Sequence, residues 1–245
     1  MILLKRALSL FRKPENSAEL SHYIALGDSI SIDDYPGEGK GAASLLYKNL
    51  DDTYPEFRGK DLQTFYPGIK FKNLAVDGAT TIDILHHQLK KIHTLSSHQV
   101  LFTLTAGGND ILTGENAEDI IFRLDAIVHE LLSNYPLAKL IIGTVYDPTD
   151  TTKILFEDRP PLDQEYKTFE IVNDAIRGFA KHPRTTIVDL FAHFLGHGNF
   201  YNDPQNPHYQ KEDPSLWYLL TIEPNARGAH EIRRLFWDAL NESET

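Results

Sequence analysis

Short apolar runs alternate along this chain with longer segments in which apolar residues recur every three or four positions. Runs of the first kind are typical of buried strands, and spacing of the second kind predicts amphipathic helices. Strands are expected at residues 22–27, 69–74, 100–105, 140–145 and 185–190. Helices are expected at residues 41–50, 80–92, 120–131, 166–179 and 232–240. The pattern therefore alternates strand and helix along most of the sequence.

This alternation predicts the fold class. Strands joined through helices pair in parallel, and a parallel sheet needs helices on both of its faces. Since such crossovers are right-handed, we expect a three-layer, flavodoxin-like α/β sandwich with a five-stranded parallel sheet. No shift in composition marks a second domain, so residues 21–245 are expected to form one domain after a leader at residues 1–20. Residues 191–218 form a long polar stretch with little periodicity, which is typical of a functional or disordered connection.

Charge and cysteine content narrow the range of functions. The 245 residues include 24 Lys and Arg against 35 Asp and Glu, a formal net charge of −11. This charge repels phosphate backbones and anionic membranes, so no nucleic acid is expected as a partner. The chain has no cysteine, which excludes disulfides, thiolate metal sites and a cysteine nucleophile. An enzyme or a binding protein for small molecules or glycans fits this composition best.

The N-terminal leader begins MILLKRALSLFRK, in which basic residues interrupt short apolar pieces. A secretory signal has its positive charges first, then an unbroken apolar run and a cleavage site with small residues. That order is missing, and no segment approaches the ~20 apolar residues of a membrane span. We therefore expect a cytoplasmic protein without stable membrane insertion. The leader is expected to pack on the domain or to be flexible, with a weak interfacial anchor as the alternative.

Small and polar residues follow four of the five expected strands. They are Gly27–Ser31 after the first strand, Asn73–Thr81 after the second, Ala106–Asp110 after the third and His193–Gly198 after the fifth. Ligands of open parallel sheets bind beyond the carboxyl ends of the strands. Because these four segments meet at that edge, the sequence predicts a functional site there.

Three of these segments contain a recognisable ordered set: Gly27-Asp28-Ser29, then Gly78 in a Gly-Ala-Thr-Thr context, then Gly107-Gly108-Asn109-Asp110. Together they resemble the first three blocks of the SGNH (GDSL-type) hydrolases, and the similarity runs from about His22 to Trp237. The resemblance implies a flavodoxin-like sandwich that hydrolyses carboxylic esters or related acyl compounds. It also implies that Ser29 is the nucleophile and that no cofactor is required.

The same residues make chemical sense without the resemblance. A serine at a strand-to-helix turn presents its hydroxyl above the sheet and its own N–H at a helix N-terminus. The backbone N–H groups of Ser29 and Gly78 and the side-chain amide of Asn109 can stabilise an oxyanion, where one donor contributes ~3–4 kcal/mol. For any one of these residues a helix cap is the simpler interpretation. The ordered set favours a catalytic site.

The last block departs from the family pattern. SGNH hydrolases normally have Asp-x-x-His followed by Pro-Asn and a glycine, where this chain reads Leu220-Thr-Ile-Glu223-Pro-Asn-Ala-Arg-Gly228. Glu223 stands at the position of the family's histidine, and Leu220 stands at the position of its aspartate. The usual general base and its orienting acid are therefore both missing.

A histidine from elsewhere is the first candidate for the base. His193 and His197 follow the fifth strand at the expected site, whereas His182, His208 and His230 are less well placed. We expect His197, flanked by two glycines, to be the base, with His193 as second candidate and Glu223 orienting the imidazole. Alternatively, Glu223 is itself the base, provided that burial raises its pKa. A third possibility is that hydrolysis has been lost and a binding pocket retained.

The spacing of His193 and His197 also suits metal ligands on a helix. Glycines at 196 and 198 argue against a regular helix, so no metal site is expected. The substrate stays open among simple carboxylic esters, O-acetylated or otherwise acylated glycans, thioesters and lysophospholipids. A catalytically silent acyl- or glycan-binding protein is the non-enzymatic alternative.

Overall fold

The computed structural model describes residues 20–92, 95, 98–156 and 158–242, so all but the last residue of the predicted leader lies outside the described residues. Five parallel strands form one sheet in the order β2-β1-β3-β4-β5. They are β1 (His22–Gly27), β2 (Lys70–Asn73), β3 (Val100–Thr105), β4 (Lys139–Gly143) and β5 (Thr185–Val188). The predicted five-stranded parallel sheet is confirmed.

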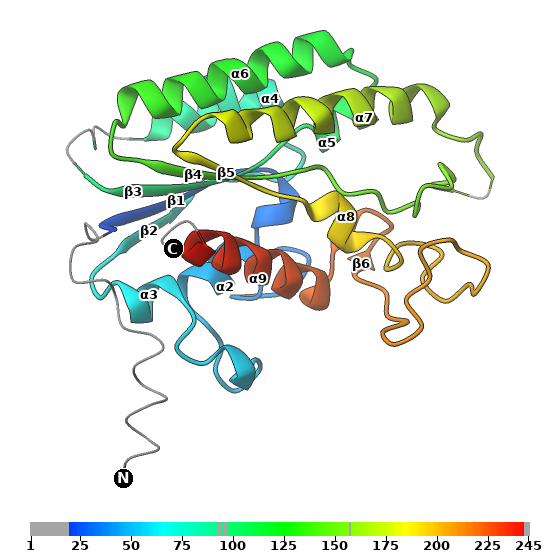
Figure 1. Cartoon of the computed structure of the whole chain (residues 1–245), viewed down its shortest axis with the longest axis horizontal. Helices are drawn as coiled ribbons and strands as arrows, with labels where there is room; N and C mark the ends of the chain where they lie inside the picture. The colour runs from blue at the N-terminus through cyan, green and yellow to red at the C-terminus, as the bar shows by residue number, and fades with distance from the viewer. Residues whose placement is uncertain (1–19, 93–94, 96–97, 157, 243–245) are drawn as a thin grey trace.

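Helices cover both faces of this sheet (Figure 1). One layer contains α4 (Thr81–Asp83), α5 (Gly108–Leu112), α6 (Ala117–Asn134) and α7 (Asp163–Gly178), and the other contains α2 (Ala42–Tyr47), α3 (Leu62–Phe65) and α9 (Ala226–Glu242). The short α8 (Leu190–Phe194) follows β5, and β6 (Tyr218–Leu219) and β7 (Glu223–Pro224) form a separate antiparallel hairpin. This is the predicted three-layer sandwich. Within the part of the chain that the structure describes, no helix has both the length and the apolar character needed to cross a bilayer.

Alternate side chains of the strands enter two different cores, one on each face of the sheet. On β1, Ile24 and Leu26 belong to the core under α6 and α7, whereas Tyr23 and Ala25 belong to the core under α2 and α9. All six residues of β3 are buried, as expected for a central strand that is covered on both faces. The sheet is thus packed on both faces, and its carboxyl edge fixes the points at which the loops after the strands begin.

The helix predicted at residues 80–92 is irregular. It begins as α4, continues as a π-helix over Ile84–Gln88 and ends as a 3-10 helix over Leu89–Lys91. The buried side-chain amide of Gln88 accepts a hydrogen bond from the Gly27 N–H at 2.9 Å and donates one to the Gly27 carbonyl at 2.7 Å. The irregular segment therefore anchors the end of β1, directly before the candidate nucleophile.

The polar stretch at residues 191–218 starts within α8 and continues through a series of turns. Asp150, which is fully buried, accepts hydrogen bonds from the backbone N–H groups of Gly196 and Gly198, at 2.9 and 3.2 Å. It also accepts one from the Asn206 side chain at 3.0 Å. These contacts, between residues about 50 positions apart, set the course of the connection.

Candidate active site

Ser29 begins a single 3-10 turn just beyond the end of β1. Gly27 has a φ of +135°, and a Cβ atom there would lie 2.2 Å from the Thr105 carbonyl oxygen, so only glycine fits. The side chain of Asp28 then caps the turn, accepting hydrogen bonds from the Ile30 N–H at 3.2 Å and the Thr105 hydroxyl at 3.0 Å. The tight approach of β1 to β3 and this cap together present Ser29 at the carboxyl edge of the sheet.

Asn109 lies in α5, just beyond the end of β3. Its side-chain amide donates a hydrogen bond to the Ala79 carbonyl at 3.0 Å, which leaves the second amide hydrogen for another acceptor. Gly78, the residue before Ala79, has a φ of +69°, and apart from its own atoms and its chain neighbours no described atom lies within 4 Å of the place where its Cβ would be. Two of the predicted oxyanion residues, Ser29 and Asn109, line one cavity, whereas Gly78 is not among the residues that line it.

A buried carboxylate fixes these loops relative to one another. Asp110 accepts hydrogen bonds from the Thr81 N–H at 3.0 and 3.2 Å, from the Thr81 hydroxyl, and from the Arg123 guanidinium at 3.1 Å. Thr81 begins α4, three residues after Gly78, and Asp110 follows Asn109 in α5. The network therefore sets the spacing of two of the predicted oxyanion donors.

The β6–β7 hairpin carries Glu223. At its turn, Leu220 and Thr221 have φ values of +48° and +76°. This left-handed backbone conformation is uncommon for residues other than glycine, and for a β-branched residue such as threonine it is an outlier. Such strain persists only where surrounding contacts over-determine the backbone, and it clusters at functional sites. One such contact is the hydrogen bond from the Tyr146 hydroxyl to the Ile222 carbonyl, at 2.6 Å.

The hairpin places Glu223 directly against Ser29. Glu223 and Ser29 line the same cavity, β7 packs on the turn that contains Ser29, and the Ser29 hydroxyl acts on Glu223 so as to lower the pKa of its carboxyl group. Glu223 is buried, and among the described residues its Oε2 atom has no hydrogen-bond partner. A buried carboxylate with free accepting capacity thus stands beside the candidate nucleophile.

Two buried carboxyl groups therefore flank Ser29. Burial raises the pKa of Asp28 to about 7, and the negative charge of Glu223 adds to this effect, while a hydrogen bond from Thr105 opposes it. Burial also raises the pKa of Glu223 above its ordinary value, with a smaller contribution from the charge of Asp77 and a partial offset from the Ser29 hydrogen bond. Both carboxyl groups are thereby stronger bases than exposed ones.

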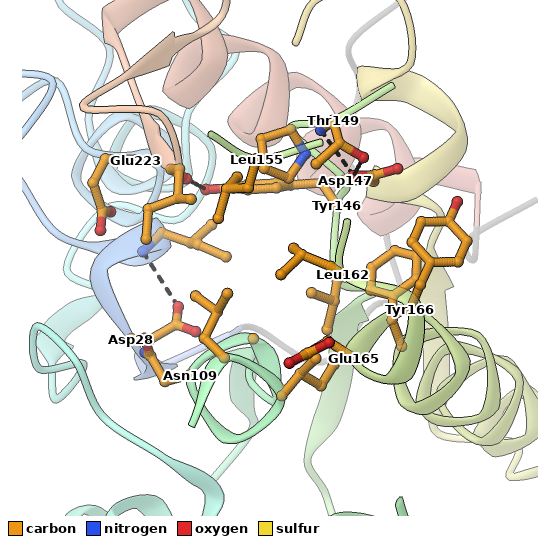
Figure 2. Close-up of a pocket in the computed structure, with 18 of the residues that line it drawn as sticks. Asp28, Asn109, Tyr146, Asp147, Thr149, Leu155, Leu162, Glu165, Tyr166 and Glu223 are labelled. Carbon is orange, nitrogen blue, oxygen red and sulfur yellow. Dashed lines mark hydrogen bonds between the residues drawn. The ribbon is translucent and has the colours of Figure 1, made fainter. Parts of the chain in front are cut away.

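Ser29, Asn109 and Glu223 open into a cavity whose walls are largely apolar. Together with its open mouth, which includes bulk solvent, the space measures about 750 Å³. The apolar lining comes from Ile30, Ile111, Leu112, Val145, Tyr146, Leu155, Leu162, Tyr166, Phe169 and Ile222. Figure 2 shows Asp28, Asn109 and Glu223 on one side of this space, and Leu162, Glu165 and Tyr166 on the other. No described lysine, arginine or histidine lines it.

The structure does not bring the predicted base to the nucleophile. The ring of His197 stacks on Trp217 with centroids 3.5 Å apart, and its Nδ1 atom bonds the Ser215 carbonyl at 2.9 Å. The Nε2 atom of His193 lies 2.9 Å from a carboxylate oxygen of Glu231 on α9. Both histidines are therefore engaged in contacts of the connection after β5, and the arrangement in which Glu223 orients His197 is not formed.

The other C-terminal histidines make further contacts of their own. His182 precedes β5 at the opposite edge of the sheet, His208 lies 3.2 Å from the Thr151 hydroxyl, and buried His230 stacks on Tyr54 with centroids 4.3 Å apart. Across the described residues, no group of three or more His, Asp or Glu side chains is arranged to hold a metal ion.

Sequence reasoning missed the walls of the cavity. Val145, Tyr146 and Asp147 follow β4, the one strand whose carboxyl end was not singled out, and Leu162 and Tyr166 come from the start of α7. The residues after β4 could have been predicted from the sequence, because the carboxyl end of β4 lies at the same edge of the sheet as those of the other four strands. Leu162 and Tyr166 could not, since apolar positions of a helix start look alike whether they line a cavity or a core.

Comparison with known proteins agrees with this architecture. Residues 25–230 match the model of the GDSL-like Lipase/Acylhydrolase family. Among solved structures, a lipolytic protein of the G-D-S-L family from Veillonella parvula DSM 2008 is 16% identical, with a TM-score of 0.59 over 90% of this chain and 98% of that one. Phospholipase A1 from Streptomyces albidoflavus NA297 is 20% identical, with a TM-score of 0.54 over 91% and 99%. The acetyl xylan esterase AlAXEase is 16% identical, with a TM-score of 0.61 over 89% and 99%. At these identities the likeness concerns the fold, and a search of curated proteins finds no match.

Proposed function

Since this chain belongs to the GDSL-like lipase and acylhydrolase family, we propose that it is a serine-dependent hydrolase of carboxylic esters, with Ser29 as its nucleophile. The observation that best supports this function is the position of Ser29. It lines a cavity with Asn109, and the hairpin strand that brings Glu223 into the same cavity packs on its turn. A serine that merely capped a helix would need neither contact.

Three donors are proposed to stabilise the tetrahedral oxyanion: the N–H groups of Ser29 and Gly78, and the amide of Asn109. The free hydrogen of the Asn109 amide and the open space beside Gly78 support this role. Preorganised donors of this kind act where negative charge develops in the transition state. The Asp110 network holds two of them in place without using the donor groups themselves.

The apolar cavity favours an acyl chain longer than acetate. An acetyl group would leave most of the apolar walls in contact with water, whereas each buried CH₂ contributes about 0.8 kcal/mol. The acidic groups Asp28, Asp147, Glu165 and Glu223 line the same space, and no described cationic side chain does. The preferred substrate is therefore proposed to be a neutral ester of a medium-length or longer acyl chain, with acylated glycans, thioesters and lysophospholipids as alternatives.

A fluorophosphonate probe tests the nucleophile, because it labels an activated serine and not a merely buried one. We expect wild-type protein to be labelled and Ser29→Ala to be unlabelled and inactive but folded. A panel of p-nitrophenyl esters from acetate to palmitate then measures the dependence of kcat/KM on chain length, with a maximum expected above acetate. If wild-type protein is neither labelled nor active on any ester, the silent binding protein is the correct alternative.

A further inference from the structure

A carboxylate lies beside Ser29 in the cavity. Glu223 lines this cavity together with Ser29, on a hairpin strand that packs against the Ser29 turn, and its Oε2 atom is buried with no hydrogen-bond partner among the described residues. The histidines that follow β5 are held elsewhere, His197 by Trp217 and Ser215 and His193 by Glu231. The position that would otherwise belong to an imidazole is thus filled by a different acid–base group.

We propose that Glu223 is the general base and general acid of the reaction, forming a serine–carboxylate pair with Ser29 and no histidine. This inference rests on the proposed function. As the Ser29 oxygen forms its bond to the acyl carbon, its proton passes to Glu223, and the carbonyl π electrons become the oxyanion. When the oxyanion collapses, the bond to the alkoxide breaks and Glu223 returns the proton to the leaving oxygen. Water then attacks the acyl-serine while Glu223 takes one of its protons, which forms a second oxyanion. When this oxyanion collapses, the bond to the Ser29 oxygen breaks, the carboxylic acid leaves, and Glu223 returns the proton to Ser29.

The surroundings of Glu223 make its carboxylate basic enough to take part. The charged and titratable groups that share electrostatic interactions with Glu223 come from separate elements. The charge of Asp77, in the loop after β2, raises the pKa of Glu223, while Glu223 in turn raises the pKa values of Asp28, Tyr35 and Tyr146. The tyrosine hydroxyls are engaged, since Tyr35 donates to Asp77 at 3.0 Å and Tyr146 donates to the Ile222 carbonyl at 2.6 Å. Burial and negative neighbours therefore act in the same direction and raise the pKa of Glu223 toward that of a useful base.

The hairpin supplies the positioning that such a base needs. A general base must stay within hydrogen-bond reach of the proton it takes. The strained Leu220–Thr221 turn and the Tyr146 bond fix the backbone on the N-terminal side of Glu223. On the other side, the Asn225 side-chain amide donates to the Leu216 carbonyl at 2.7 Å. The carboxylate is thus held from both directions.

Four variants measured together test this inference: Glu223→Gln, His197→Gln, His193→Gln and Ser29→Ala. We expect Glu223→Gln to lower kcat/KM by roughly 10²- to 10⁴-fold, mainly through kcat, because proton transfer acts in the transition state. The two histidine variants should stay within a few-fold of wild type once the folded fraction is taken into account. Since burial disfavours the charged form of Glu223, the neutral glutamine should not lower the free energy of unfolding at pH 7.

The wild-type pH profile provides an independent measurement. The acid limb of kcat/KM should have an apparent pKa above that of an ordinary glutamate. Because Glu223 and Asp28 interact, this apparent pKa describes the two carboxyl groups together. Carboxyl ionisation has little enthalpy, so this limb should move little with temperature, whereas an imidazole limb would shift clearly downward on warming. An inactive His197→Gln or His193→Gln beside an active Glu223→Gln, or a temperature-sensitive limb, would overturn the inference while Ser29→Ala remained inactive. An active Ser29→Ala would instead overturn the proposed function.

Discussion

Replacing Asp110 with alanine perturbs the site without touching any group proposed to contact substrate. The change removes the acceptor of the buried Thr81 N–H and of the Thr81 hydroxyl, and it removes one partner of Arg123. Arg123 keeps its bond to Glu115, and its side chain is 13% exposed, so its charge is not left alone in the protein. The unsatisfied Thr81 N–H should lower the free energy of unfolding by about 1–3 kcal/mol, and the lost hydrogen bond of the Thr81 hydroxyl should lower it by about 1 kcal/mol.

We therefore expect Asp110→Ala to lower the free energy of unfolding by about 3 kcal/mol, a little below the usual cost of breaking a fully buried pair. Catalysis should fall as well, through kcat, because α4 is no longer tied to α5 and the Gly78 and Asn109 donors lose their fixed spacing. Urea unfolding followed by tryptophan fluorescence gives the stability, and ester hydrolysis of the folded protein gives kcat.

Asp125→Ala is the matched control, since Asp125 is an exposed carboxylate in the middle of α6 and its loss should change stability by no more than ~0.5 kcal/mol. A loss below about 1 kcal/mol for Asp110→Ala, or an unchanged kcat, would refute the coupling of these loops through Asp110.

Three further changes test other parts of the site. Asn109→Ala should lower kcat by on the order of 10²-fold with little change in KM, and an effect on KM alone would make Asn109 a ground-state binding residue. Gly27→Ala should cost about 3 kcal/mol or more in urea unfolding, because its Cβ meets the Thr105 carbonyl at 2.2 Å, and a near-neutral result would contradict this packing. The pKa of Asp28 is about 7 in the folded protein against 3.8 ordinarily, so the folded state binds its proton more tightly. Wild-type stability should therefore fall, relative to Asp28→Asn, as pH rises from about 4 to about 7. If the free energies of unfolding of the two proteins changed in parallel with pH, the pKa of Asp28 would not be raised in the folded state.

Local patterns in the sequence determined the sheet and the nucleophile loop. Apolar runs of strand length separated by helical spacing leave few arrangements for a chain of this size, and right-handed crossovers select the flavodoxin-like sandwich. The positions of Ser29 and Asn109 followed from the same reasoning, because both come within a few residues of the end of a strand. At so short a distance the chain has little freedom to carry a residue away from the sheet edge.

Only the tertiary structure decided which residue meets Ser29. Glu223 and the histidines after β5 lie on a connection of more than thirty residues, whose course depends on bonds to Asp150 and Tyr146 from distant parts of the chain. The left-handed turn at Leu220 and Thr221 has no sequence signal either, since both residues disfavour it. Periodicity describes which face of an element is buried, but the direction of a long connection is set by contacts that form only after the sheet has assembled. For that reason the carboxylate at the nucleophile could be considered from the sequence, and its place beside Ser29 could be seen only in the folded chain.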